Sequence, residues 1–167
     1  TTTVSKAAVK NENSTTQAVD KVKDAVVSVI TYSSNSQNSL ITSDETDTDT
    51  NAEQVFSEGS GVIYKKEGDT AYIVTNTHVI NGAKKVDIRL ADGTKVPGDI
   101  VGSDTYSDIA VVKIAADKVT TVAEFGDSNQ LTVGETAIAI GSPLGSEYAN
   151  TVTQGIVSSL NRNVSLK

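Results

Sequence analysis

The sequence contains no cysteine, no methionine and no tryptophan, and its 167 residues include one histidine and two prolines. Without cysteine the chain forms no disulfide and has no thiolate metal site or cysteine nucleophile. A single histidine leaves no credible zinc cluster, so we expect no metal. Because translation starts at methionine, the absence of methionine indicates a processed or excised piece of a longer protein.

Basic residues are also scarce. The chain has 14 Lys and Arg against 21 Asp and Glu, a net charge of −7. Nucleic acids are bound through clustered Lys and Arg, and no such stripe occurs, so we expect no nucleic-acid partner. No apolar run approaches the roughly 18 residues of a membrane span, and no signal sequence opens the chain.

The first part of the chain alternates between polar and apolar segments. Residues 1–16 are polar and lack a sustained period, which predicts a flexible tail. Three valines at helical spacing (Val19, Val22 and Val26) predict a short helix over 17–23, with Thr15 or Thr16 as its N-cap. The β-branched residues that follow predict a strand over 25–32.

An acidic segment follows this strand. Residues 33–60 carry six Asp or Glu, and no Lys or Arg occurs between Lys23 and Lys65. Uncompensated like charges with few apolar residues do not repay the entropy of ordering, which predicts a flexible surface loop. A solvated insertion and a regulatory loop both remain open as interpretations.

Short β-branched runs separated by turn residues make up the rest of the chain. They predict strands over 59–66, 70–80, 84–90, 94–104, 108–114, 135–142 and 150–160. Asp92-Gly93 supplies a hairpin turn between two of them. Evenly spaced short strands without helical segments between them predict an all-β barrel or sandwich.

His78 and Asp108 are the candidate catalytic residues. His78 stands at the end of the apolar run "AYIVTNTHVI", and Asp108 directly precedes the strand "IAVVKI", 30 positions later. Taken singly, each has a structural interpretation, the first as a packed histidine and the second as a turn cap. Together they suit a triad in which a carboxylate orients an imidazole that takes a proton from serine.

The third member of such a triad is a serine in a glycine turn, whose N–H groups form an oxyanion hole. Ser128 lies in "FGDSNQ" and Ser142 in "IGSPLG", and neither is followed by a glycine pair. We interpret Ser128 as part of a turn or short cap. No serine of this chain has the surroundings of an activated nucleophile.

The order of motifs resembles one family. "GSGVIY", "YIVTNTHVI", "SDIAVVKI", "AIGSPLG" and "TVTQGIVSSLNR" are similar, in this order, to the protease domain of HtrA (high-temperature-requirement A) serine endopeptidases. The resemblance runs from about residue 25 to residue 162. It implies that His78 is the general base and Asp108 its orienting acid. The family's serine-bearing turn has no counterpart before Lys167, which implies that this chain alone is inactive.

The resemblance also implies a fold and a setting. The family fold is a trypsin-like double β-barrel, here expected as residues 17–126 (helix and complete first barrel) and residues 127–167 (a linker and the first two strands of an incomplete second barrel). It implies no cofactor, misfolded protein substrates in stress-linked quality control, a homotrimer formed through the N-terminal helix, and an extracytoplasmic location with a membrane tether.

Two other classes of protein remain open from the sequence. The chain as it stands could be a non-catalytic β-barrel module that binds proteins through its cleft or its exposed strand edges. It could also be a small β-sandwich adhesin with an incidental histidine and aspartate. The second hypothesis predicts that His78 and Asp108 lie far apart.

Overall fold

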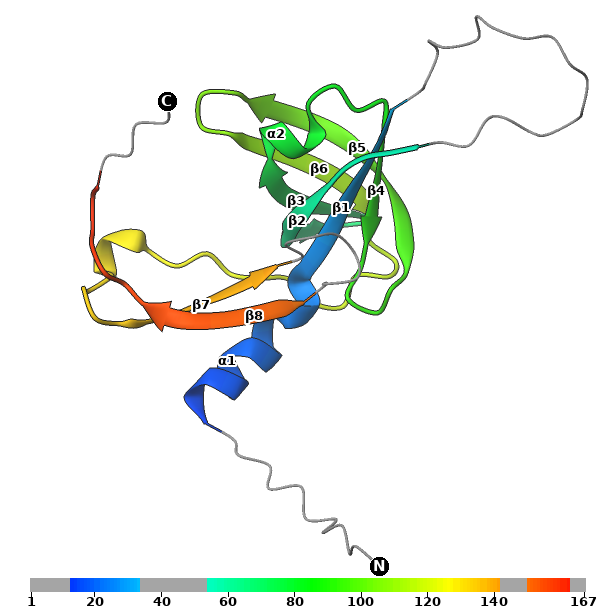
Figure 1. Ribbon diagram of the computed structural model, residues 1–167. Helices are drawn as coiled ribbons and strands as arrows, with labels where there is room; N and C mark the ends of the chain where they lie inside the picture. Colours follow the sequence, from blue (N-terminus) through cyan, green and yellow to red (C-terminus); the bar gives the residue numbers. More distant parts are fainter. Residues whose placement is uncertain (1–12, 34–53, 142–149, 163–167) are drawn as a thin grey trace, which may run out of the picture.

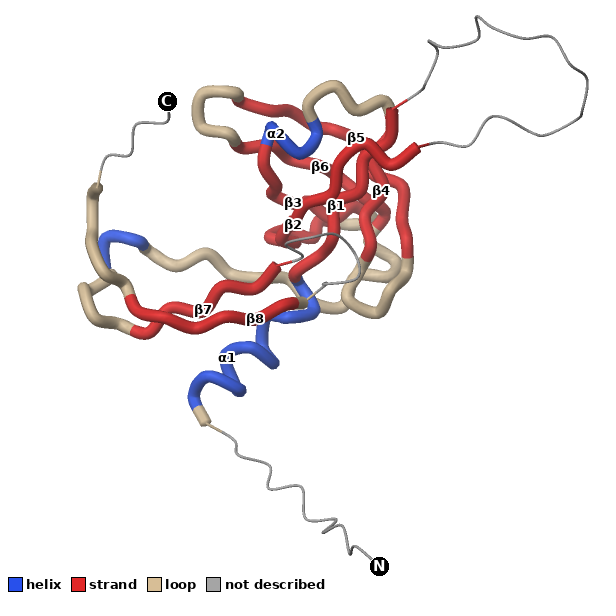
Figure 2. Tube along the Cα trace, viewed as in Figure 1, coloured by secondary structure: helices blue, strands red, loops and turns tan. Residues whose placement is uncertain are grey.

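The computed structural model describes residues 13–33, 54–141 and 150–162. The expectations for residues 1–12, for 34–53 and for Ser142 therefore fall outside the described residues. Within the described ranges, six strands form a closed antiparallel barrel and two more form a hairpin beside it (Figure 1). Figure 2 separates these strands from the short helical segments.

The elements follow in chain order. They are α1 (Ser14–Val22), the 3₁₀ helix η1 (Lys23–Ala25), β1 (Val26–Ser33), β2 (Gln54–Glu67), β3 (Thr70–Asn76), α2 (Thr77–Ile80), β4 (Lys85–Arg89), β5 (Lys95–Asp104), β6 (Ile109–Ala115), the 3₁₀ helix η2 (Ser128–Gln130), β7 (Thr136–Gly141) and β8 (Thr151–Ile156). None of the helices in the described ranges is long and apolar enough to cross a membrane.

The barrel has the strand order β1-β2-β3-β6-β5-β4, and β4 pairs back onto β1 to close it. Burial alternates along β3 and β6, where every second side chain is buried and points into the barrel interior. The interior is filled by small and branched apolar side chains, which include Val27, Val29, Ile63, Ile73, Ile88 and Val112. A complete six-stranded barrel followed by two further strands confirms the fold expected from the sequence.

The turn predicted at Asp92-Gly93 is confirmed. Gly93 has a φ of +87°, a left-handed conformation that suits glycine. The Asp92 carboxylate accepts a hydrogen bond from the Thr94 N–H at 2.8 Å, and this bond lowers the pKa of Asp92. The turn joins β4 to β5.

Several boundaries differ from the sequence prediction; β8, for example, ends at Ile156 and not at residue 160. The helix begins at Ser14 because Asn13, a strong N-cap residue, accepts a hydrogen bond from the Thr16 N–H at 3.0 Å. Thr15 and Thr16 are therefore inside the helix. Residues 54–60 belong to β2 and not to a loop, because they pair with β1 as far as Ser33, with one shift of register between Thr31 and Tyr32. The acidic Glu58 is accommodated within this strand.

The hairpin of β7 and β8 contacts the barrel through β1 and β2. At Gly141 the approach is close, because a Cβ there would lie 2.8 Å from the Ser60 hydroxyl oxygen. Every residue of β8 is exposed. Few of its side chains are thus removed from water, in contrast to β1, which is buried on both faces along most of its length.

Gly61 packs against the barrel interior, and we expect Gly61→Ala to destabilise the fold by about 1–3 kcal/mol. The added Cβ would lie 2.7 Å from Ile73 Cγ2 and 3.0 Å from Val29 Cγ2. The measurement is urea unfolding. Gly102→Ala on β5 is the matched control, since a Cβ there meets no atom within 4 Å among the described residues. Equal losses in the two variants would refute this account of the core.

Amide exchange tests the difference between barrel and hairpin. We expect the amides of β7 and β8 to exchange faster than those of β1–β6, because the two-stranded sheet has little buried surface to resist opening. The measurement is hydrogen–deuterium exchange on the monomeric chain. Uniform protection across both sheets would contradict the expectation.

Candidate active site

His78 is the second residue of α2, the single helical turn that follows β3. The sequence placed it at the end of the strand, but the strand ends two residues earlier, at Asn76. The Asn81 N–H donates to the Thr77 carbonyl at 2.9 Å and closes the turn. Val79 and Ile80 point into the core because they are apolar, while the His78 side chain is exposed.

Asp108 lies in the turn between β5 and β6 and has a φ of +56°. Aspartate is among the few residues other than glycine that adopt this left-handed conformation. The turn is capped by Asp104, whose carboxylate accepts hydrogen bonds from Tyr106 N–H, Ser107 N–H and Ser107 Oγ at 3.2, 3.1 and 2.6 Å. The cap of this turn is therefore Asp104 and not Asp108, for which a turn cap was the structural interpretation.

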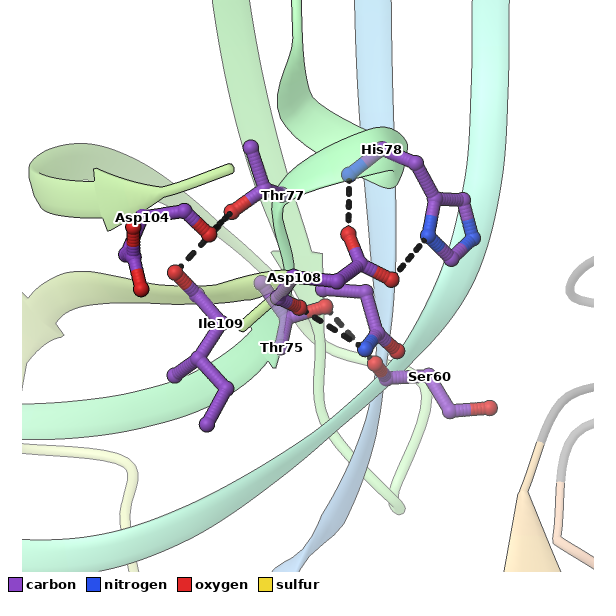
Figure 3. Close-up of polar contacts among 8 residues, drawn as sticks. Ser60, Thr75, Thr77, His78, Asp104, Asp108 and Ile109 are labelled. Atoms are coloured by element: carbon purple, nitrogen blue, oxygen red, sulfur yellow. Dashed lines mark hydrogen bonds and ion pairs between the residues drawn. The ribbon is translucent and has the colours of Figure 1, made fainter. Parts of the chain in front are cut away.

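The Asp108 carboxylate holds His78 at two points (Figure 3). Its Oδ1 accepts the His78 backbone N–H at 2.9 Å, and its Oδ2 lies 2.6 Å from the ring nitrogen Nδ1. These bonds, first the backbone N–H and then the ring nitrogen, lower the pKa of Asp108. The carboxylate is thus ionised at neutral pH. A proton on Nδ1 faces it, which leaves Nε2 as the basic nitrogen.

The carboxylate of Asp108 is not buried. The side chain of Asp108 is 43% exposed and that of His78 is 71% exposed. Both residues stand beyond the ends of β3 and β6, at the rim of the barrel and outside its core. The two side chains are therefore held in place by the hydrogen bonds between them and not by burial.

The remaining sequence hypotheses about the site can be compared with the structure. Ser128 begins η2, and Asp127 caps that turn by accepting from the Asn129 N–H at 2.9 Å, so the interpretation of Ser128 as part of a turn is confirmed. No serine hydroxyl bonds the His78 ring among the described residues. The sandwich hypothesis is wrong, because the strands form a closed barrel and His78 contacts Asp108.

Sequence reasoning missed the residues that support the pair. The Asn76 side chain donates to the Asp108 carbonyl at 3.0 Å, and the Thr77 N–H donates to the same oxygen at 3.1 Å. Among the described residues, no group of three His, Asp or Glu side chains is placed to hold a metal ion.

Asp108 should make a pH-dependent contribution to stability. Its pKa is lower in the folded chain than the ordinary value of about 3.9, so the contribution is present above that value and is lost as the pH falls through the lowered pKa. We expect Asp108→Asn to reduce the urea midpoint at pH 7 and to reduce it less at pH 3.

The matched control for this prediction is Asp99→Asn, since the Asp99 side chain makes no hydrogen bond or ion pair within the described ranges. It should leave the pH dependence of the midpoint unchanged. If Asp108→Asn lowers the midpoint equally at both pH values, the ionised carboxylate is not the source of the stabilisation.

Comparison of the sequence with known proteins places this chain in a family. A family model for the trypsin-like peptidase domain matches residues 59–166. Serine protease Do-like HtrA of Lactococcus lactis subsp. lactis is 50% identical over 157 residues, which cover 90% of this chain and 38% of that protein. The protein of the same name from Bacillus subtilis is 46% identical over 161 residues, which cover 95% of this chain and 35% of that protein.

A third relative, Serine protease HtrA-like of Staphylococcus aureus, is 48% identical over 107 residues, which cover 64% of this chain and 14% of that protein. The chain thus spans well under half the length of the curated relatives it matches. The matched segment contains the motifs that carry the resemblance in the sequence. The closed barrel and the hairpin after it are the fold that this resemblance implies. The chain belongs to the trypsin-like peptidase domain family, and within it to the HtrA serine proteases.

Proposed function

We propose that His78 is the general base and Asp108 the orienting acid of a Ser-His-Asp triad in an HtrA-like serine endopeptidase. The observation that carries the proposal is the two-point contact, in which one carboxylate binds both the backbone N–H and the ring Nδ1 of His78. This contact sets the position and the tautomer of the imidazole together. It also leaves Nε2 directed away from the carboxylate (Figure 3).

The chemistry follows from this arrangement. Nε2 takes the proton of the serine hydroxyl as the serine oxygen attacks the scissile carbonyl, and the Asp108 carboxylate stabilises the resulting imidazolium. The imidazolium then gives its proton to the leaving amine, and the peptide bond breaks to an acyl-enzyme. A water molecule, deprotonated by the same Nε2, hydrolyses the ester and restores the serine.

We propose that the nucleophilic serine is not among residues 1–167, so that this chain alone does not hydrolyse peptides. Ser128 begins a 3₁₀ helix, and its neighbour Asp127 uses its carboxylate to cap that helix. The nucleophile needs a turn whose backbone N–H groups converge on the oxyanion. In this proposal β7 and β8 are the opening strands of the second barrel.

The substrates, assembly and location are part of the same proposal. The relatives are serine proteases by name, and on the family resemblance we assign misfolded or unfolded proteins as the substrates. We also assign an extracytoplasmic location, a membrane tether and a homotrimer formed through the N-terminal helix. In α1 no residue is buried within this chain, which leaves the helix available for contact with other subunits.

The competing proposal is a module that binds proteins without cleaving them. It is favoured by apolar side chains exposed on the hairpin, since Val152 is 41% and Ile156 is 65% exposed. Large exposed apolar side chains are typical of interaction sites. In this case His78 has no role in any activity of the full-length protein.

Casein hydrolysis by the chain extended past Lys167 separates the two proposals. We expect the extended chain to cleave casein, and His78→Ala to reduce kcat/KM by at least about 10⁴-fold, because alanine cannot accept the proton of the serine hydroxyl. Asp108→Asn should cause a loss of similar order, since an amide no longer favours the required tautomer.

Asp99→Asn is again the matched control, as an acid-to-amide change on the same barrel away from the pair, and it should retain activity. Equal activity of the wild type and His78→Ala would exclude the base assignment. Binding of unfolded casein without cleavage, unchanged by His78→Ala, would favour the interaction module. Residues 1–167 alone should show no cleavage.

A further inference from the structure

Thr77 is a buried polar residue directly before His78, and its side chain faces away from the imidazole. It is 7% exposed, while the neighbouring histidine is exposed. A buried hydroxyl is unfavourable unless it is hydrogen-bonded. The buried Thr77 hydroxyl is therefore expected to have a hydrogen-bond partner at the rim of the barrel.

The Thr77 hydroxyl reaches two carbonyl oxygens of the β5–β6 turn (Figure 3). Its Oγ1 lies 3.0 Å from the Asp104 oxygen and 2.9 Å from the Ile109 oxygen. A hydroxyl carries one proton, so the two carbonyls share it. Asp104 ends β5 and Ile109 begins β6, and the two residues are paired in the sheet. The hydroxyl thus links both ends of the turn that contains Asp108.

Asp108 needs such support because its backbone is in the left-handed region. Thr77 acts on it from two directions. Its N–H donates to the Asp108 carbonyl at 3.1 Å, and its hydroxyl fixes Ile109, the next residue along the chain. The carboxylate that leaves this constrained backbone then meets the His78 N–H and Nδ1.

We propose that Thr77 is a positioning residue for the His78–Asp108 pair: its hydroxyl ties the ends of the β5–β6 turn so that the Asp108 carboxylate reaches Nδ1. Thr77 touches no reacting atom and acts through Asp108. The effect of Thr77 on catalysis rests on the proposed function, whereas its effect on the geometry of the pair does not.

The test replaces Thr77 with valine, which keeps the shape and removes the hydroxyl, and with serine, which keeps the hydroxyl. Thr75→Val is the matched control. Thr75 is 5% exposed, and its hydroxyl donates at 2.8 Å to the Ser60 carbonyl on β2 and not to a carbonyl of the β5–β6 turn. Thr77→Ala serves as a second variant without the hydroxyl and with no added bulk.

The first measurement is NMR on residues 1–167, in which His78 is the only histidine and its ring proton is unambiguous. We expect Thr77→Val to weaken the Nδ1–H signal of the bonded ring and to move the pKa of Asp108 back toward its ordinary value. Thr77→Ser and Thr75→Val should leave both unchanged. An unchanged Asp108 pKa in Thr77→Val and Thr77→Ala would overturn the assignment.

The second measurement is kcat and KM of the extended chain on a peptide substrate. We expect Thr77→Val to lower kcat by roughly 10- to 100-fold with KM unchanged, because a small misplacement of the acid misaligns the base. Thr77→Ser should restore kcat. An equal loss of kcat in Thr75→Val would show a general effect of stability and overturn the assignment.

The two measurements distinguish the failures. If His78→Ala retains full activity, the proposed function fails, and the NMR comparison still decides whether Thr77 positions Asp108. If His78→Ala is inactive and Thr77→Val has normal kcat and a normal Nδ1–H signal, the function stands and the role of Thr77 is wrong. If Thr77→Val and Thr77→Ala do not fold while Thr75→Val does, Thr77 is a stability residue and the assignment is overturned.

Discussion

The antiparallel register between β3 and β6 is the constraint from which the site follows. Its last pair joins Asn76 to Ile109, so the next residue on each side of this pair, Thr77 and Asp108, meets at the rim. The register is set by the interior, where Ala71, Ile73 and Thr75 lie opposite Ile114, Val112 and Ala110. A slip of one residue would turn these side chains out of the core, and so the packing of the barrel fixes the partners of a polar site outside it.

The rim itself is held by hydrogen bonds whose energies are comparable to the strain they oppose. A left-handed backbone at a residue other than glycine costs roughly 1–3 kcal/mol. The Asp108 carbonyl accepts from Thr77 and Asn76, and each such bond contributes about 0.5–1.5 kcal/mol. A third bond, from the His78 N–H to the ionised carboxylate, is of the stronger charge-assisted kind. The conformation is therefore sustained locally, without burial of the acid.

The barrel was predictable from the sequence because period-two alternation and turn residues are local signals. The strands around Ile73 and Val112 follow directly from them, and the His78–Asp108 pair could be inferred from residue types and motif order. The left-handed backbone of Asp108 and its two-point contact with His78 could not, because both depend on hydrogen bonds between segments about 30 residues apart. The start of β2 at Gln54 likewise depends on pairing with β1, which overrides a polar, acidic composition.

The open position of the pair has a consequence for its electrostatics. In contact with water, the attraction between an imidazolium and a carboxylate is reduced by a high effective dielectric constant. A surface placed over His78 and Asp108, which are 71% and 43% exposed, would expel that water. A drop in the effective dielectric constant from about 80 to about 20 makes the same attraction roughly fourfold stronger. The barrel thus determines where the two groups lie, and any surface that covered them would determine how strongly they act on each other.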